Sequence, residues 1–350
     1  MEELVKVVNT YINKKLLNLE NLPKNLEGGI FTDRIFAKKF RKYGIDPSVK
    51  TNTEHKLNSI VNKKLPLNFV PSFGGYKHWW SPDYPSIGWA EIFNFKFMLE
   101  WLSPIFSNYK PSVSIEYESE EIILSELNNI PQSGLDEYTR TFRLALEYFN
   151  KQLKGQNCEM LLTLAREQYE SYGFNKEKLL KRINEMLPDY EKRFDNYDKD
   201  DQERRIQKAK TNFKLDGVED YTKLTDQEKQ KLFKWSRIFN EAFLDADFEI
   251  RGTDFFDKEN NIPLLFSFGL GPGGEFWPHV GSSHSSMVDF RAGLGVLEIR
   301  NNGKIVERIL SRKQFESISS QLKKVEVDTP LSNICDNFKY IHVYEGMLNF

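Results

Sequence analysis

Hydrophobic positions recur with two different periods along the chain, and the order of these periods predicts the fold class. The predicted β-strands are short apolar segments at 65–73, 113–117, 158–164 and 263–268. Between the first three, apolar residues recur three or four positions apart over 89–106 and 136–153, which predicts helices. Strands that alternate with helices are typical of a parallel sheet covered by helices. We therefore predict an α/β protein with a Rossmann-like, mostly parallel sheet flanked by helices.

Residues 175–235 have a different pattern, because charged side chains dominate and strand signals are missing from the sequence there. This predicts a charged helical insertion with solvated faces, and the alternative is a lid that closes on a substrate. Residues before 65 show helical spacing. The predicted units are an N-terminal helical segment (1–64), a first α/β part (65–174), the insertion (175–235) and a C-terminal α/β part that completes the same domain (236–350).

A β-hairpin is predicted close to the C-terminus. The segments 294–300 and 305–310 flank the sequence Asn301-Asn302-Gly303-Lys304. Asn-Gly between two strands favours a type I′ turn, in which two residues take positive φ. A C-terminal hairpin therefore completes the predicted fold.

Composition narrows the class of protein. The 350 residues hold 49 Lys and Arg against 51 Asp and Glu, a net charge of −2, whereas nucleic-acid binders are usually basic. The two cysteines, Cys158 and Cys335, form no CxxC pair, so metal and redox motifs of that kind are absent from the sequence. No stretch approaches the roughly 20 apolar residues that cross a bilayer, and Met1–Leu19 lacks the apolar centre of a signal peptide. We expect a cytoplasmic protein without nucleic-acid or membrane partners.

The first candidate site follows the strand predicted at 65–73. Its sequence is Phe73-Gly74-Gly75-Tyr76-Lys77-His78. Two glycines after a strand let the backbone approach a ligand closely, and a lysine there can hold a phosphate or carboxylate or attack a carbonyl. The alternative is a tight turn with a solvated lysine. The segment is neither a P-loop nor a dinucleotide-binding fingerprint.

The second candidate site is the glycine-rich segment from Gly269 to Arg291, which follows the last predicted strand of the sheet. His279 can act as an acid or base near neutral pH, and Arg291 can bind an anion. The alternative is a glycine-rich surface turn with structural histidines. His279, His284 and Asp289 match no standard zinc spacing, so we expect no metal.

The chain resembles the isocyanide (isonitrile) synthase family, which is related to the pyoverdine and dityrosine biosynthesis proteins. The resemblance covers the layout of residues 65–150 and 260–315. The segments that carry it are Pro71–Lys77, Ser81-Pro82 with Pro85 and Ala90-Glu91, Tyr109-Lys110-Pro111, Ser114–Ser119, Leu135–Tyr138, Phe276–His279 and the Asn302-Gly303 turn.

The resemblance implies an enzyme that converts the amino group of an L-amino acid to an isonitrile. The added carbon would come from a sugar phosphate such as ribulose 5-phosphate, without a further cofactor. Such chemistry needs a cation for the phosphate, an acid or base for imine formation and an aromatic pocket. The expected catalytic residues are Lys77 and His279. The expected substrate-binding residues are Tyr76, Trp79, Trp277, Arg291, Gly74 and Gly75.

Two other functions stay open at this point. One is another sugar-phosphate or nucleotide-sugar transferase. For such an enzyme Asp245-Ala246-Asp247 would be a formal metal-binding pair, although its apolar neighbours favour a helix face. The other is a non-catalytic interaction protein that uses the charged insertion as its contact surface. Neither the substrates nor the oligomeric state follow from the sequence.

Overall fold

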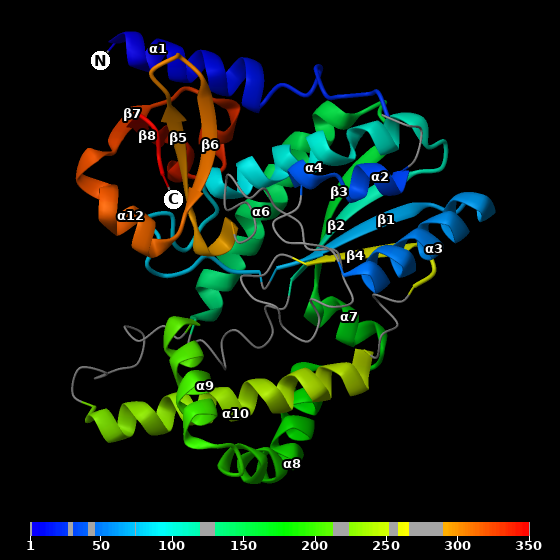
Figure 1. Cartoon of the computed structure of the whole chain (residues 1–350), viewed down its shortest axis with the longest axis vertical. Helices are drawn as coiled ribbons and strands as arrows, with labels where there is room; N and C mark the ends of the chain where they lie inside the picture. Colours follow the sequence, from blue (N-terminus) through cyan, green and yellow to red (C-terminus); the bar gives the residue numbers. More distant parts are fainter. Residues whose placement is uncertain are drawn as a thin grey trace.

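The chain forms two β-sheets, a helical layer and a separate helical insertion (Figure 1). The computed structural model describes residues 2–26, 31–40, 46–73, 75–119, 130–212, 224–251, 258–265 and 290–349. The strands of the first sheet are β1 (Leu67–Ser72), β2 (Val113–Ser119), β3 (Cys158–Leu164) and β4 (Asn261–Leu265). Those of the second sheet are β5 (Leu294–Ile299), β6 (Ile305–Leu310), β7 (Lys323–Glu326) and β8 (Tyr340–Glu345).

The first sheet is parallel throughout, which confirms the predicted fold class. Its strand order is β3-β2-β1-β4. The chain moves from β1 outward to β3 and then returns to place β4 on the other side of β1. Strand order therefore reverses between β1 and β4, and ligands of open α/β sheets bind beyond the carboxyl ends of the strands at such a reversal.

Helices join the strands of the first sheet, and others, α1 and α12 among them, contact the second. The N-terminal helices are α1 (Glu2–Tyr11), the π-helix η1 (Ile12–Leu16), α2 (Phe31–Ile35), the 3-10 turn η3 (Lys38–Phe40) and α3 (Pro47–Lys63). The crossover helices are α4 (Trp89–Asn108), α6 (Gln132–Leu153) and α7 (Ala165–Ser171). The C-terminal helices are α12 (Arg312–Ile318) and the 3-10 turns η6 (Phe290–Ala292), η7 (Ser319–Gln321), η8 (Pro330–Asn333) and η9 (Asp336–Lys339).

Helix α4 is the centre of the molecule, because it contacts elements of the second sheet as well as packing on the first. Nearly all its residues from Trp89 to Phe106 are buried, as expected of a helix that is hydrophobic all round. Gly295 of β5 lies against its first turn, and a Cβ there would lie 2.6 Å from the backbone nitrogen of Ala90. Because Gly295 has no side chain, β5 of the second sheet can pack directly against the first turn of α4, which also packs on the first sheet.

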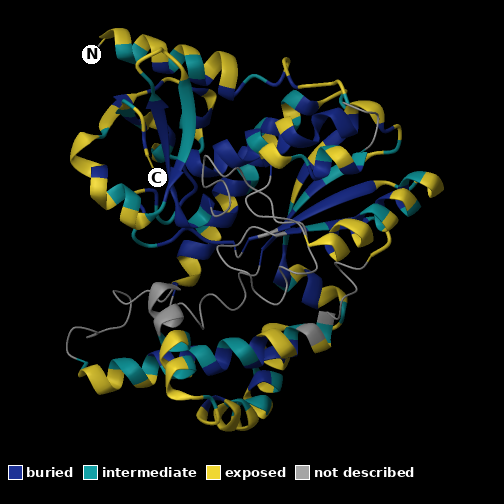
Figure 2. Ribbon diagram, in the orientation of Figure 1, coloured by how far each residue is buried: buried dark blue, intermediate teal, exposed yellow. Residues whose placement is uncertain are grey.

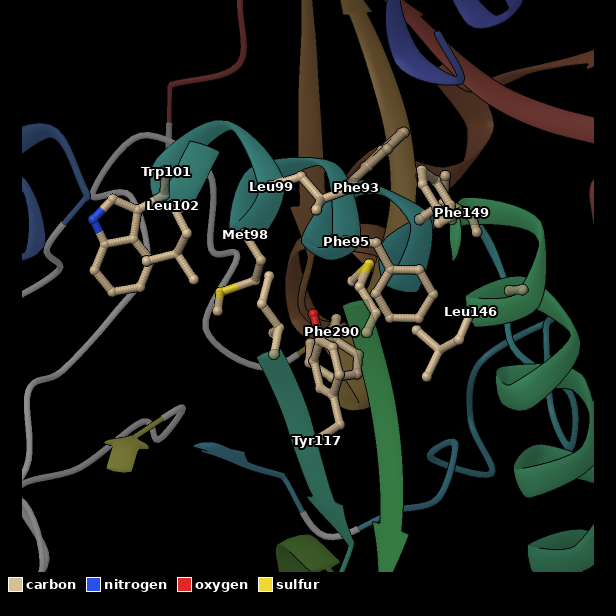
Figure 3. Close-up of a cluster of buried hydrophobic side chains, with 14 of the residues drawn as sticks. Phe93, Phe95, Met98, Leu99, Trp101, Leu102, Tyr117, Leu146, Phe149 and Phe290 are labelled. Carbon is tan, nitrogen blue, oxygen red and sulfur yellow. The ribbon is translucent and has the colours of Figure 1, made fainter. Parts of the chain in front are cut away.

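Aromatic rings fill the core between α4, α6 and the ends of the strands (Figure 3). Tyr117 of β2 meets Phe142 of α6 edge to face at 5.3 Å between ring centroids. Phe290, near the end of the glycine-rich segment, lies beside Tyr117 with the centroids 6.2 Å apart. The C-terminal third of the chain is thus tied into the core of the first sheet.

The charged insertion is helical, as predicted, and lies apart from the second sheet (Figures 1 and 2). It consists of α8 (Lys176–Asp195), α9 (Lys199–Asn212) and α10 (Asp226–Arg251), so its last helix continues beyond residue 235. Its small core joins Leu179 and Ile183 of α8 to Phe243 of α10, and Tyr169 of α7 packs into the same cluster. The division of the chain into four units stays a prediction.

The predicted C-terminal hairpin is present, but its turn differs from the expected type. Strands β5 and β6 pair antiparallel, with Ile299 opposite Ile305. Among the turn residues, Gly303 has a positive φ of 77° and Asn302 does not, so the turn is not type I′. A single left-handed glycine after two right-handed residues is typical of three-residue hairpin loops. The sequence did not predict β7 and β8, which complete this sheet.

None of the described helices is long and apolar enough to cross a bilayer. The cytoplasmic location stays a prediction. Cys158 and Cys335 are both free thiols, and burial raises the pKa of each.

Candidate functional site

The candidate site lies where the strand order reverses, at the carboxyl ends of β1 and β4. These strands end side by side, with Ser72 paired to Leu265. The first predicted cluster follows β1 and the second follows β4. The first cluster also contacts the end of the second cluster. Lys77 Nζ donates a hydrogen bond of 3.2 Å to the carbonyl of Phe290, and the His78 peptide N–H donates one of 3.0 Å to the carbonyl of Arg291.

The turn after β1 passes close to the end of β2. Gly75 has a positive φ of 83°, and a Cβ on it would lie 1.7 Å from Ser119 Oγ. Both facts require glycine at this position, because other residues rarely adopt this φ and the space is filled. Gly75 therefore sets the path of the chain into Tyr76, Lys77 and His78.

Lys77 is fully buried, and its ammonium is bonded to protein acceptors. Its Nζ lies 3.0 and 3.1 Å from the two carboxylate oxygens of Glu91 and donates to the carbonyl of Gly293 at 2.9 Å. With the bond to Phe290, these acceptors use all three ammonium protons. Lys77 thus links the turn after β1 to the first turn of α4 and to the entry of β5. This arrangement is typical of a structural ion pair, and a catalytic role for Lys77 stays a prediction.

Glu91 holds this junction together from the first turn of α4. Its carboxylate accepts from the backbone N–H of Gly88 at 2.9 Å and from the Tyr138 hydroxyl at 3.1 Å. Asp83 adds a second buried carboxylate, with Oδ2 3.7 Å from Lys77 Nζ. Burial raises the pKa of both carboxyl groups, and the positive charge of Lys77 opposes that rise.

Tyr76, His78 and Arg291 form a second group of side chains at the site, beside the buried charges of Lys77, Glu91 and Asp83. The His78 ring stacks on Tyr76 at 5.1 Å between centroids and 19° between planes. The Arg291 guanidinium lies over the same tyrosine, 5.1 Å from its ring centroid. His78 is buried, and its Nε2 atom has no hydrogen-bond partner. Burial, followed by the charges of Arg291 and Lys77, lowers the pKa of His78 well below 6.5, so the imidazole is neutral at neutral pH.

Some predicted site residues lie elsewhere or cannot be placed. Trp79 is partly buried, with the Arg312 guanidinium of α12 lying 5.1 Å from the centroid of its indole ring. Gly74, Trp277 and His279 lie outside the described residues. Their roles stay predictions, as do those of Gly75, Tyr76 and Arg291, although the last two are in contact.

The formal acidic pair of the insertion is engaged in its packing. The hydroxyl of Tyr190 donates to Asp245, and that of Tyr169 donates to Asp247. The first pair fastens α10 to α8 within the insertion, and the second fastens α10 to α7. Within the described part of the chain, no group of three or more His, Cys, Asp or Glu side chains is placed to hold a metal ion.

The sequence analysis missed three buried groups of this site, namely His78, Asp83 and Glu91. His78 had one available signal, because it directly follows Lys77 in the first cluster. Glu91 lies in the Ala90-Glu91 pair of the family resemblance, but nothing local indicates that it is the partner of Lys77. That pairing depends on how α4 meets the sheet.

This arrangement of sheets belongs to a known class of α/β fold. The structure is similar to the crystal structure of the PvcA protein from Pseudomonas aeruginosa, with a TM-score of 0.62 over 90% of this chain and 99% of that chain. The sequences are 14% identical in this comparison, so the likeness shows the fold. No protein-family model and no curated protein sequence matches this chain.

Proposed function

We propose that this protein is an isocyanide synthase-like enzyme that converts the amino group of an L-amino acid to an isonitrile, with a sugar phosphate as the carbon donor. The observation that carries the proposal is the contact of Lys77 and His78 with Phe290 and Arg291. These contacts join the two parts of the sequence that resemble the family. They do so beside the reversal of strand order in a fold shared with the PvcA protein.

Arg291 is the described residue best suited to bind the phosphate or the amino-acid carboxylate. Its guanidinium lies over Tyr76, and this cation–π contact orients it at the site. A guanidinium matches the geometry of phosphate and carboxylate with two parallel hydrogen bonds. Tyr76 supplies one wall of an aromatic site, to which Trp79 and Trp277 are further candidates.

Lys77 has a positioning role in this proposal. Its ammonium fixes the turn after β1 to α4 and β5, and the stacked pair Tyr76 and His78 flanks it in sequence. A change at Lys77 would therefore act on the reaction by moving its neighbours. His279 remains the predicted acid or base of the glycine-rich segment, and Gly74 and Gly75 remain predicted substrate-binding residues.

Mass spectrometry tests the reaction class directly. Purified protein is incubated with tyrosine, tryptophan or phenylalanine, labelled with ¹⁵N at the amino group, and with a panel of pentose phosphates that includes ribulose 5-phosphate. We expect an isonitrile that retains the label. Arg291→Gln should raise the KM for the sugar phosphate or the amino acid about 10- to 100-fold, the range for a lost charged hydrogen bond.

Arg182→Gln is the matched control, because Arg182 is an exposed arginine of the insertion that pairs with Glu249. It should leave both KM values unchanged. A labelled product that forms from a nucleotide sugar would favour the transferase alternative. If no product forms and no ligand shifts the melting temperature, the enzyme proposal fails and the insertion becomes the candidate contact surface.

A further inference from the structure

The His78 imidazole is a buried polar group with an unused atom. Its side chain is buried, with the ring stacked on Tyr76, and Nε2 forms no hydrogen bond. Almost all buried polar side-chain atoms of folded proteins are paired, so an unpaired one needs a reason. One common reason is a role in catalysis, where the missing partner arrives with the substrate.

His78 is also fixed in place. Its ring stacks on Tyr76, and its peptide N–H is bonded to the carbonyl of Arg291. The preceding residue, Lys77, is held by Glu91 and by the carbonyl of Gly293. A side chain that is already held in place before the substrate binds loses little conformational entropy on reaching the transition state.

We propose that His78 is a catalytic residue of this site and transfers the proton when the substrate amine condenses with the sugar carbonyl. The inference rests on the proposed function and assigns one step of it. Nε2 takes a proton from the ammonium group of the amino acid. The free amine then forms the N–C bond to the carbonyl carbon as the C–O π bond breaks, and a second proton moves from this nitrogen to the oxygen to give a hydroxyl. The imidazolium returns its proton to that hydroxyl, which leaves as water when the C–O bond breaks and the protonated imine forms.

The charges around His78 make its basicity depend on the substrate. Among the described residues, Arg291 and Lys77 are the charged groups that face it, and both disfavour its protonation in the free enzyme. Glu91 and Asp83 already pair with Lys77. A phosphate or carboxylate bound by Arg291 would offset its positive charge and make the imidazole a stronger base. The base would thus become effective once the anionic substrate is bound.

The test compares His78→Gln with His55→Gln, a matched change at an exposed histidine of α3. Isonitrile formation is followed by mass spectrometry over a range of pH. We expect His78→Gln to lower kcat about 100- to 10,000-fold, the usual contribution of a positioned acid or base, with KM changed much less. The acidic limb of the kcat profile should disappear, and His55→Gln should behave as wild type.

Chemical rescue of the His78→Ala variant is a second measurement, and a purely structural role of His78 would give no rescue. Free imidazole should restore part of its activity by entering the space left by the ring. Both variants are checked for folding by circular dichroism, and His78→Asn replaces either one that fails to fold. Wild-type kcat in a folded His78→Gln or His78→Asn variant would overturn this inference alone. Absence of product from the wild-type protein would overturn the proposed function and this inference together.

Discussion

One ion pair of the parallel-sheet body and one of the helical insertion differ sharply in burial. In the body, Lys77 and Glu91 are both fully buried, 0% exposed, with Nζ and Oε1 3.0 Å apart. In the insertion, Arg182 and Glu249 are 41% and 47% exposed although their contact is shorter, at 2.7 Å. Judged by distance alone, the second pair would be the stronger interaction. Burial makes the first pair the stronger interaction, because water screens the charges of an exposed pair and not those of a buried one.

The difference indicates what each region does. A buried pair is expensive to desolvate, so its value lies in fixing neighbouring groups when all its bonds are made. Lys77 and Glu91 join β1, α4 and β5 at the point where the two predicted clusters meet. The exposed pairs of the insertion keep a charged helical surface solvated, and its small apolar core holds α8 and α10 together. The candidate chemistry therefore belongs to the body.

The largest expected effect comes from breaking the buried pair. Lys77→Met removes the ammonium and leaves the Glu91 carboxylate buried beside Asp83, with the Gly88 N–H and the Tyr138 hydroxyl as its donors. We expect a loss of about 3–5 kcal/mol in the free energy of unfolding, the usual cost of an uncompensated buried charge. Urea denaturation followed by circular dichroism measures it.

The double variant Lys77→Met with Glu91→Gln is the control for this prediction. It removes both charges, so it should be more stable than Lys77→Met alone, since no buried charge is left without a partner. Equal stability of wild type and Lys77→Met would show that the pair is not buried as described.

A smaller effect is expected from the titration of His78. Its pKa is well below 6.5 in the folded protein because of burial, Arg291 and Lys77. The unfolded chain takes up this proton near pH 6.5 and the folded chain does not, so the contribution is present above that pH and is lost as the pH falls. Relative to His78→Gln, the wild-type protein should lose up to about 1.4 kcal/mol per pH unit below this point.

Comparison with His78→Gln isolates this contribution from those of the neighbouring groups. The raised pKa values of Asp83 and Glu91 act in the opposite direction, and the lowered pKa of His342 acts in the same direction. All three are common to both proteins and cancel in the difference. Urea denaturation from about pH 5 to about pH 8 covers the titration range of histidine. A difference that stays constant over this range would contradict a neutral buried His78.

Much of the fold could be predicted from the sequence because it depends on local periodicity. The strands at 67–72, 113–119 and 158–164 and the helix at 89–108 each carry their pattern within a single segment. The turn at Gly303 was predicted as a hairpin, but its type depends on the φ of Asn302, which Asn-Gly does not determine. The short strands β7 and β8 carry weak patterns, and β8 pairs with β5, which lies far from it in sequence, while β7 pairs with β8.

The candidate site was predicted in part, for a related reason. Glycines and a lysine directly after a strand indicated the right place, because that end of a parallel sheet is where ligands bind. The state of Lys77 was not predictable, since its partner Glu91 is buried only once α4 is enclosed between the two sheets. The unpaired Nε2 of His78 is likewise a property of packing, and no sequence pattern marks it.

The smallest effect is expected from breaking the exposed pair of the insertion. Arg182 donates from Nε and Nη2 to the two carboxylate oxygens of Glu249 at 2.7 and 3.0 Å. Despite this two-bond geometry, Arg182→Gln should leave the melting temperature unchanged within error, at low and at high salt, because solvent competes for both partners. Differential scanning fluorimetry of this variant beside Lys77→Met makes the comparison direct. If Arg182→Gln were as destabilising as Lys77→Met, burial would not be what separates the two regions, and the insertion would be an integral part of the core.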